Sequence, residues 1–121
     1  MDPACPIRLL LSGPLAFGPG KAELLEKIDE CGSMQAAAAA MEMSYMKAWK
    51  MVKGLNERFR EPLVSLQRGG KEQVGATLTA VGREILALYH EAVKAAEVAT
   101  APILARMTGR LASDDANSSI A

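Results

Sequence analysis

The sequence predicts a mainly α-helical protein that carries one small β hairpin, and three observations support this class. Two helical patterns meet at a tight turn within residues 31–59. Two short apolar runs flank a glycine-rich loop within residues 63–79, as in a hairpin. A single helical pattern then continues over residues 79–107. Together these elements predict a winged helix-turn-helix, mainly α with a small β wing, followed by a long C-terminal dimerisation helix.

Length and composition predict one compact domain. The chain has 121 residues, half of them apolar, which is enough for one hydrophobic core and short for two. We expect a disordered N-terminus at 1–6, the winged helix-turn-helix at 7–78, the long helix at 79–107 and a disordered tail at 108–121.

The first part of the chain predicts a hairpin and then a helix. The apolar run 7–11 suits a strand that pairs with residues 15–17 across a tight turn. Apolar residues at helical spacing then predict a helix over 21–31, with Cys31 buried. Because Cys5 and Cys31 are far apart and form no CxxC pair, they predict reduced thiols and not a zinc site.

The helix-turn-helix is predicted from its capping residues. Gly32 can adopt the left-handed conformation that ends a helix, and Ser33 can then cap the next one. The alanine run 36–40 favours a helix that a neighbouring helix can approach closely. Residues 42–43 turn the chain, and Ser44 caps the second helix. The inward face of that helix is the apolar stripe Ala48, Val52, Leu55 and Phe59.

The opposite face of the second helix is cationic, with Lys47, Lys50 and Lys53. Lysines on a helix are often only a solvated surface, and this alternative stays open. In a helix-turn-helix, however, the second helix enters the DNA major groove with its N-terminal residues at the base edges. The order of elements therefore predicts DNA contacts from Ser44, Tyr45, Lys47, Lys50 and Lys53.

The hairpin behind this helix is the predicted wing. Residues 63–67 and 76–79 are its predicted strands, and the loop between them carries Arg68 and Lys71 among glycines. A wing here can lie along the DNA backbone or minor groove, where Arg68, Lys71 and Arg83 would contact phosphates. An ordinary surface hairpin is the alternative. A nucleotide phosphate loop is excluded because these glycines precede a strand and not a helix.

The long helix is predicted to pair two copies of the chain. Thr79 is suited to cap it, and apolar residues recur every three or four positions on more than one side. One small core cannot cover so much apolar surface, so we expect a homodimer. Packing of both apolar stripes within one monomer is the alternative. Pro102 should kink or end the helix.

The net charge is zero, but the charges are unevenly distributed along the chain. Residues 44–83 hold eight Lys and Arg against three acidic residues, and the remainder holds six against eleven. This asymmetry predicts one positive surface over the second helix and the hairpin, which suits double-stranded DNA as the partner.

Enzymatic, metal-binding and membrane functions lack support in the sequence. His90 is the single histidine and has no nucleophile placed beside it, so we expect it on the surface. No cysteine and histidine cluster suits a metal, and no cofactor is expected in this chain. No apolar run reaches eighteen residues, and the N-terminus does not resemble a secretory signal, which predicts a cytoplasmic protein.

Four segments of the chain form a specific combination: LAFGPGKAELLEKIDECGSM, the alanine run followed by MSYMKAW, LNERFREPLV, and the GG…G-A-T-LTAVGRE segment. They cover about two thirds of the chain and resemble the N-terminal DNA-binding domain of the ModE family of molybdate-responsive transcription regulators. The resemblance implies a winged helix-turn-helix of the kind also seen in LysR-type regulators, followed by a long helix that pairs two subunits. It also places Ser44, Tyr45, Lys47 and Lys50 on the recognition helix and residues 68–75 in the wing.

Two departures from the family pattern limit what the resemblance implies. The segment Lys71-Glu72-Gln73-Val74 interrupts the glycine run of the wing. Full-length members continue into small β-barrel domains that bind molybdate, whereas this sequence stops at Ala121. We therefore expect no molybdate sensor in this chain, and molybdate control would need a separate partner chain.

The sequence thus predicts a sequence-specific, DNA-binding transcription regulator of the ModE type that is not an enzyme and binds a pseudo-palindromic operator as a dimer. The helix-turn-helix order, the regional charge and the wing favour this function. A protein-interaction module on a winged-helix scaffold that does not bind DNA is the alternative. The zero net charge and the methionine-rich second helix favour that alternative.

Overall fold

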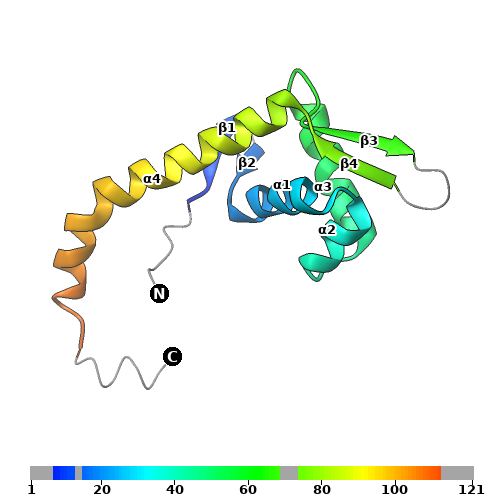
Figure 1. Cartoon of the computed structure of the whole chain (residues 1–121). Coiled ribbons are helices and arrows are strands. Elements are labelled where there is room, and N and C mark those ends of the chain that lie inside the picture. The colour runs from blue at the N-terminus through cyan, green and yellow to red at the C-terminus, as the bar shows by residue number, and fades with distance from the viewer. Residues whose placement is uncertain (1–6, 13–14, 69–73, 113–121) are drawn as a thin grey trace.

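The computed structural model describes residues 7–12, 15–68 and 74–112, and Figure 1 shows how its elements are arranged. Three helices form a compact group, a β hairpin projects from one side of it, and one long helix extends away on the other side. This architecture confirms the predicted winged helix-turn-helix with a long C-terminal helix. The elements are, in chain order, β1 (Leu9–Ser12), β2 (Leu15–Phe17), α1 (Pro19–Cys31), α2 (Met34–Ala40), α3 (Tyr45–Arg58), β3 (Val64–Arg68), β4 (Val74–Leu78) and α4 (Ala80–Thr108).

Some predicted features fall outside this part of the chain. The N-terminal segment 1–6, residues 113–121 of the predicted tail, and Lys71 of the predicted wing lie outside the described residues. Within the described ranges, no helix is both long enough and apolar enough to cross a membrane.

The hydrophobic core lies between α1, α2, α3 and the β3–β4 hairpin. Leu24, Leu25 and Ile28 of α1 are fully buried, at the predicted helical spacing. In α2, Ala37 and Ala38 are buried, because alanine lets the neighbouring helices approach closely. The buried residues of α3 and of the hairpin complete the core: Ala48, Val52, Leu55, Leu63, Val64, Ala76 and Leu78.

Side chains cap the N-termini of three helices, as the sequence predicts. Gly32 ends α1 in the left-handed conformation, with φ of 76°, so that α2 starts in a new direction. Glu42 also has a positive φ, of 55°, in the turn before α3. The capping hydrogen bonds, each 3.0 Å long, run from Ala36 N to Ser33 Oγ, from Lys47 N to Ser44 Oγ and from Gly82 N to Thr79 Oγ1.

The wing is an antiparallel hairpin in which β3 and β4 pair along their whole lengths. β4 begins at Val74, two residues earlier than predicted. Contacts outside the hairpin explain the difference: Gly75 forms a bridge with Ser33, and Ala76 N donates a hydrogen bond of 3.0 Å to Gly32 O. These contacts fix β4 to the junction of α1 and α2, so the wing is held against the start of the helix-turn-helix.

The first half of α4 packs on the N-terminal elements. Tyr89 is buried, its hydroxyl donates to the carbonyl oxygen of Ile7 at 2.8 Å, and its ring centroid lies 5.3 Å from that of Phe17. Pro102 does not end the helix, which continues to Thr108. Figure 1 shows the axis of α4 turning in its last third, as expected where a proline removes one helical hydrogen bond.

The predicted burial of Cys31 is wrong, because this residue is exposed. Cys31 is the last residue of α1, and the chain leaves the helix at Gly32 immediately afterwards. The buried stripe of α1 therefore ends at Ile28, one turn earlier. The predicted N-terminal hairpin is confirmed, with β1 paired antiparallel to β2.

Candidate nucleic-acid interface

The helix α3 has one buried face and one exposed face. Ala48, Val52 and Leu55 are buried in the core, as their helical spacing predicts. Lys47 and Lys50 are exposed on the opposite side, near the N-terminus of the helix. The N-terminus of a helix carries a partial positive charge, so both lysines add to a potential that attracts anions.

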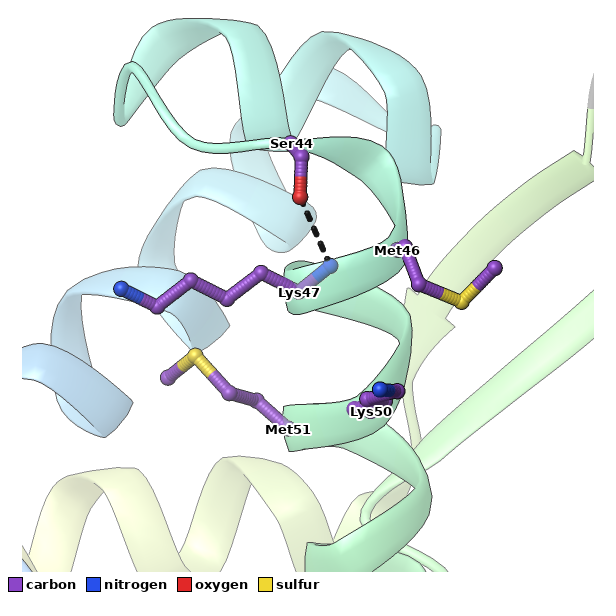
Figure 2. A pocket seen from close by; sticks show the side chains of 5 residues that line it. All are labelled: Ser44, Met46, Lys47, Lys50 and Met51. Atoms are coloured by element: carbon purple, nitrogen blue, oxygen red, sulfur yellow. Dashed lines mark hydrogen bonds between the residues drawn. The ribbon is translucent and has the colours of Figure 1, made fainter.

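A shallow, open hollow of about 410 Å³ lies on this exposed face, and Figure 2 shows its lining. Met46 projects from one side of α3, Lys47 and Met51 project from the other, and Lys50 is seen nearly end-on in front of the helix below Met46. Ser44 lies at the top of the helix, where its hydroxyl oxygen accepts the hydrogen bond from the backbone of Lys47. The hollow thus combines two ammonium groups with two flexible apolar side chains.

The predicted lysines of α3 differ in their partners. Among the described residues, neither Lys47 nor Lys50 has a carboxylate within 4.0 Å of its ammonium nitrogen. Lys53, by contrast, lies 4.0 Å from a carboxylate oxygen of Glu57 and 5.2 Å from the ring centroid of Trp49. Lys47 and Lys50 therefore present their full charge to a ligand, and Lys53 is partly engaged within its own helix.

The other predicted contact residues lie in different environments. Tyr45 is half-buried and packs against the hydrophobic core. Arg68 is the last residue of β3, at the far end of the hairpin. Arg83 lies on α4, where its guanidinium binds a carboxylate oxygen of Asp29 on α1 at 2.9 Å. The structure therefore brings Ser44 and the first two lysines together, and it turns the Arg83 side chain toward α1.

The sequence prediction missed Asn56, which ties α3 to the base of the wing. Its Oδ1 accepts hydrogen bonds from Leu63 N at 2.9 Å and from Val64 N at 3.1 Å. Its Nδ2 donates to Val64 O at 3.0 Å. The sequence offers one signal for this role. Asparagine has a poor helix propensity, and an asparagine inside a helix is often kept there because its side chain bonds to backbone groups.

Asn56→Ala is expected to lower the free energy of unfolding by about 2 kcal/mol, because two backbone N–H groups and one carbonyl lose their partner. Gln35→Ala is the matched control, since Gln35 is an exposed amide on a helix, and its replacement should change stability by less than about 0.5 kcal/mol. Urea unfolding followed by circular dichroism measures both. Equal values for the two variants would refute the role of Asn56.

One other polar pair lies on the surface, between α4 and α1. His90 is exposed, as predicted, and its Nε2 lies 2.6 Å from a carboxylate oxygen of Glu26. In the part of the chain that the structure describes, no group of three or more His, Cys, Asp or Glu side chains is placed to hold a metal ion.

Comparisons with solved structures agree with this fold. The chain superposes on a crystal structure of a CbnR_DBD–DNA complex with a TM-score of 0.54, at 22% identity, covering 75% of this chain and 97% of that chain. A structure of a Lactococcus lactis ZitR variant gives a TM-score of 0.55 at 17% identity, covering 92% of this chain and 73% of that chain. At these identities, the likeness establishes the winged-helix fold.

Comparisons with curated proteins and family models are more specific. The chain is 32% identical over 83 residues to the transcriptional regulator ModE of Haemophilus influenzae, covering 69% of this chain and 32% of the relative. It is 35% identical over 96 residues to the molybdenum transport protein ModE of Azotobacter vinelandii, covering 79% of this chain and 34% of the relative. The chain thus spans about a third of the length of these relatives, which agrees with the resemblance to the ModE DNA-binding domain.

A family model, described as the bacterial regulatory helix-turn-helix protein of the lysR family, matches residues 20–83. The match runs from α1 through the wing to the first turn of α4 and includes every described residue of the hollow on α3. Because it covers more than half of the sequence, the chain belongs to the lysR family of bacterial regulatory helix-turn-helix proteins.

Proposed function

We propose that this chain is a DNA-binding transcription regulator that inserts α3 into the major groove. One observation carries the proposal: the N-terminal half of α3 presents Lys47 and Lys50, both without a carboxylate partner among the described residues, at the positive end of the helix. An α-helix fits the major groove, and lysines there can bind phosphate or the O6 and N7 atoms of guanine. Such a regulator acts in the cytoplasm, where bacterial DNA lies.

We propose that the wing and the remaining contact residues position α3 on the DNA. The β3–β4 hairpin projects beyond the three-helix group, so it can lie along the DNA backbone beside the groove that holds α3. In this arrangement Arg68 and Lys71 contact phosphates from the wing, and Tyr45 supports α3 from its half-buried place. Arg83 contributes by holding α4 to α1 through Asp29, and Lys53 by adding positive charge at the edge of the interface.

The dimer that we propose uses α4. Beyond residue 93, the large apolar side chains of this helix are exposed, among them Ile103, Leu104 and Met107. An exposed apolar helix of this kind favours pairing with a second copy. Two recognition helices would then reach half-sites one DNA turn or a multiple of it apart, about 34 Å per turn, which predicts a pseudo-palindromic operator.

Control by molybdate is a separate question. The names of several relatives refer to molybdenum, but the chain matches about a third of their length. If molybdate governs this regulator, we propose that the ion binds outside the described residues, for example on a separate partner chain.

The proposal predicts a strong salt dependence of DNA binding. In gel-shift titrations with operator DNA selected from a random pool, log affinity should fall linearly with log salt concentration. Lys47→Ala with Lys50→Ala should lower the affinity about a hundredfold at low salt. If each lysine makes one phosphate contact, the slope of log affinity against log salt concentration should also become less steep by about 2.

A control with the same change of charge makes this test specific. Lys27→Ala with Lys94→Ala also removes two positive charges, but from α1 and the middle of α4. This variant should lose less than about threefold in affinity, because distant charges are largely screened. Equal losses in the two variants would contradict docking by α3. Failure of the unmodified chain to select any DNA would favour the protein-interaction alternative.

A further inference from the structure

Met46 stands out among the methionines near the recognition helix because it is exposed. Between residues 34 and 51, all of which the structure describes, Met34 is fully buried, and Met41, Met43 and Met51 pack partly against the core. Met46 is 56% exposed and takes no part in that packing. A single exposed apolar side chain is common on protein surfaces. Met46, however, lines the hollow at the leading end of α3 together with Lys47 and Lys50, and this placement points to a ligand contact.

The direction of the side chain fits a base contact in the groove. Met46 is the second residue of α3, within the turn that enters deepest when a recognition helix docks by its N-terminus. Lys50 follows four residues later, so both side chains lie on the same side of the helix, with Lys50 below Met46 in Figure 2. Their Cβ atoms are about 6 Å apart, which spans about two base-pair steps of 3.4 Å.

We infer that Met46 determines sequence preference by packing on the methyl group of a thymine. In the major groove, the C5-methyl of thymine is the apolar group that distinguishes the bases, and a flexible thioether chain can adapt to it. Lys50, on the same side, binds a guanine through O6 and N7. Each half-site therefore holds a thymine within about two base pairs of a guanine. This inference rests on the proposed docking of α3 in the major groove.

Removal of the thymine methyl group tests the contact directly. In the selected operator, each thymine is replaced in turn by deoxyuridine, which lacks only the methyl group and keeps its hydrogen bonds. For the unmodified chain, replacing thymine by deoxyuridine at one position in each half-site should lower the affinity about fourfold. This is the loss expected for one methyl contact. Fluorescence anisotropy with a labelled duplex at fixed salt measures this change.

Variants of Met46 separate its role from a general loss of binding. Met46→Ala should weaken binding to the thymine operator and should no longer distinguish thymine from deoxyuridine at that position. Met46→Leu keeps an apolar side chain of similar volume, so it should keep the preference for thymine. Because Met46 lies outside the core, these variants should unfold at the same denaturant concentration as the unmodified chain.

The possible outcomes distinguish this inference from the proposed function. Met46 does not contact thymine if deoxyuridine lowers the affinity at no thymine position, or if it lowers the affinity of Met46→Ala as much as that of the unmodified chain. In either case, docking by α3 stands. If the random pool yields no preferred sequence, and Lys47→Ala with Lys50→Ala has no effect on binding, the proposed function fails and the role of Met46 fails with it.

Discussion

Gly82→Ala is expected to lower the free energy of unfolding by about 3 kcal/mol. Gly82 is buried in the first turn of α4, where this helix lies against Leu63, the residue before β3. A Cβ atom at this position would lie 2.1 Å from the carbonyl oxygen of Leu63. That oxygen already accepts a hydrogen bond of 2.9 Å from Thr79 N, so it cannot move away without losing this bond. The overlap involves backbone atoms, and no side-chain rotation relieves it.

The loss is large relative to the stability of such a domain, which is about 5–15 kcal/mol. Gly54→Ala is the control, because Gly54 lies within α3 and a Cβ atom there would meet no atom within 4 Å. Alanine at that position should raise the free energy of unfolding by about 0.5–1 kcal/mol, since it favours the helix. Denaturant unfolding of both variants, followed by circular dichroism, should give changes of opposite sign. Two changes of the same sign would show that Gly82 does not pack against the backbone of Leu63 as described.

Elements that depend on neighbours in sequence could be predicted from the sequence. The caps at Ser33, Ser44 and Thr79 follow from local hydrogen bonds over three residues, and all three form. The buried stripe of α3 follows from helical periodicity in the same way. The order of the elements also followed from these local patterns, the family resemblance supported it, and the fold agrees with that order.

Features that depend on contacts between distant elements could not be predicted. Asn56 was missed because its partners are created by the path of the chain beyond α3, seven and eight residues later. The ion pair of Arg83 with Asp29 joins residues of α4 and α1, and no periodicity indicates it. The exposure of Met46 likewise depends on where the core lies, which is on the other side of α3.

The predicted positive surface is smaller within the described residues than the charge count suggests. Lys47 and Lys50 share the exposed face of α3, whereas Lys53 interacts with its own helix and Arg83 binds Asp29. A count of charges along the chain cannot show which are neutralised by nearby partners. Lys47 and Lys50 lie in the N-terminal half of α3, which is the half that enters the groove in a helix-turn-helix.

The largest functional effect is expected from the far half of α4, because it would join two DNA-binding units. The helix has 29 residues and is about 43 Å long, yet among the described residues only its first half packs on other elements. Beside that first half lies an apolar hollow of about 180 Å³, and the second half carries exposed apolar residues of its own. The proposed two-fold dimer would cover both surfaces, since each chain offers one hollow and one extended helix end. The residues that line the hollow are Leu9, Leu11, Phe17, Phe59, Ile85, Leu88 and Tyr89.

Ile103→Glu with Met107→Glu should therefore convert the proposed dimer to a monomer. The affinity for a two-half-site operator should fall at least about a hundredfold, because the second half-site is no longer bound by a linked partner. Affinity for a single half-site should stay the same, since both residues lie far from α3 along α4. Light scattering after size-exclusion chromatography, together with gel shifts on both DNAs, measures these effects. Lys94→Glu is the control, as it makes the same change in charge on about the opposite side of the helix from Ile103. A double variant that stays dimeric would place the subunit contact elsewhere and leave the exposed apolar end of α4 without this explanation.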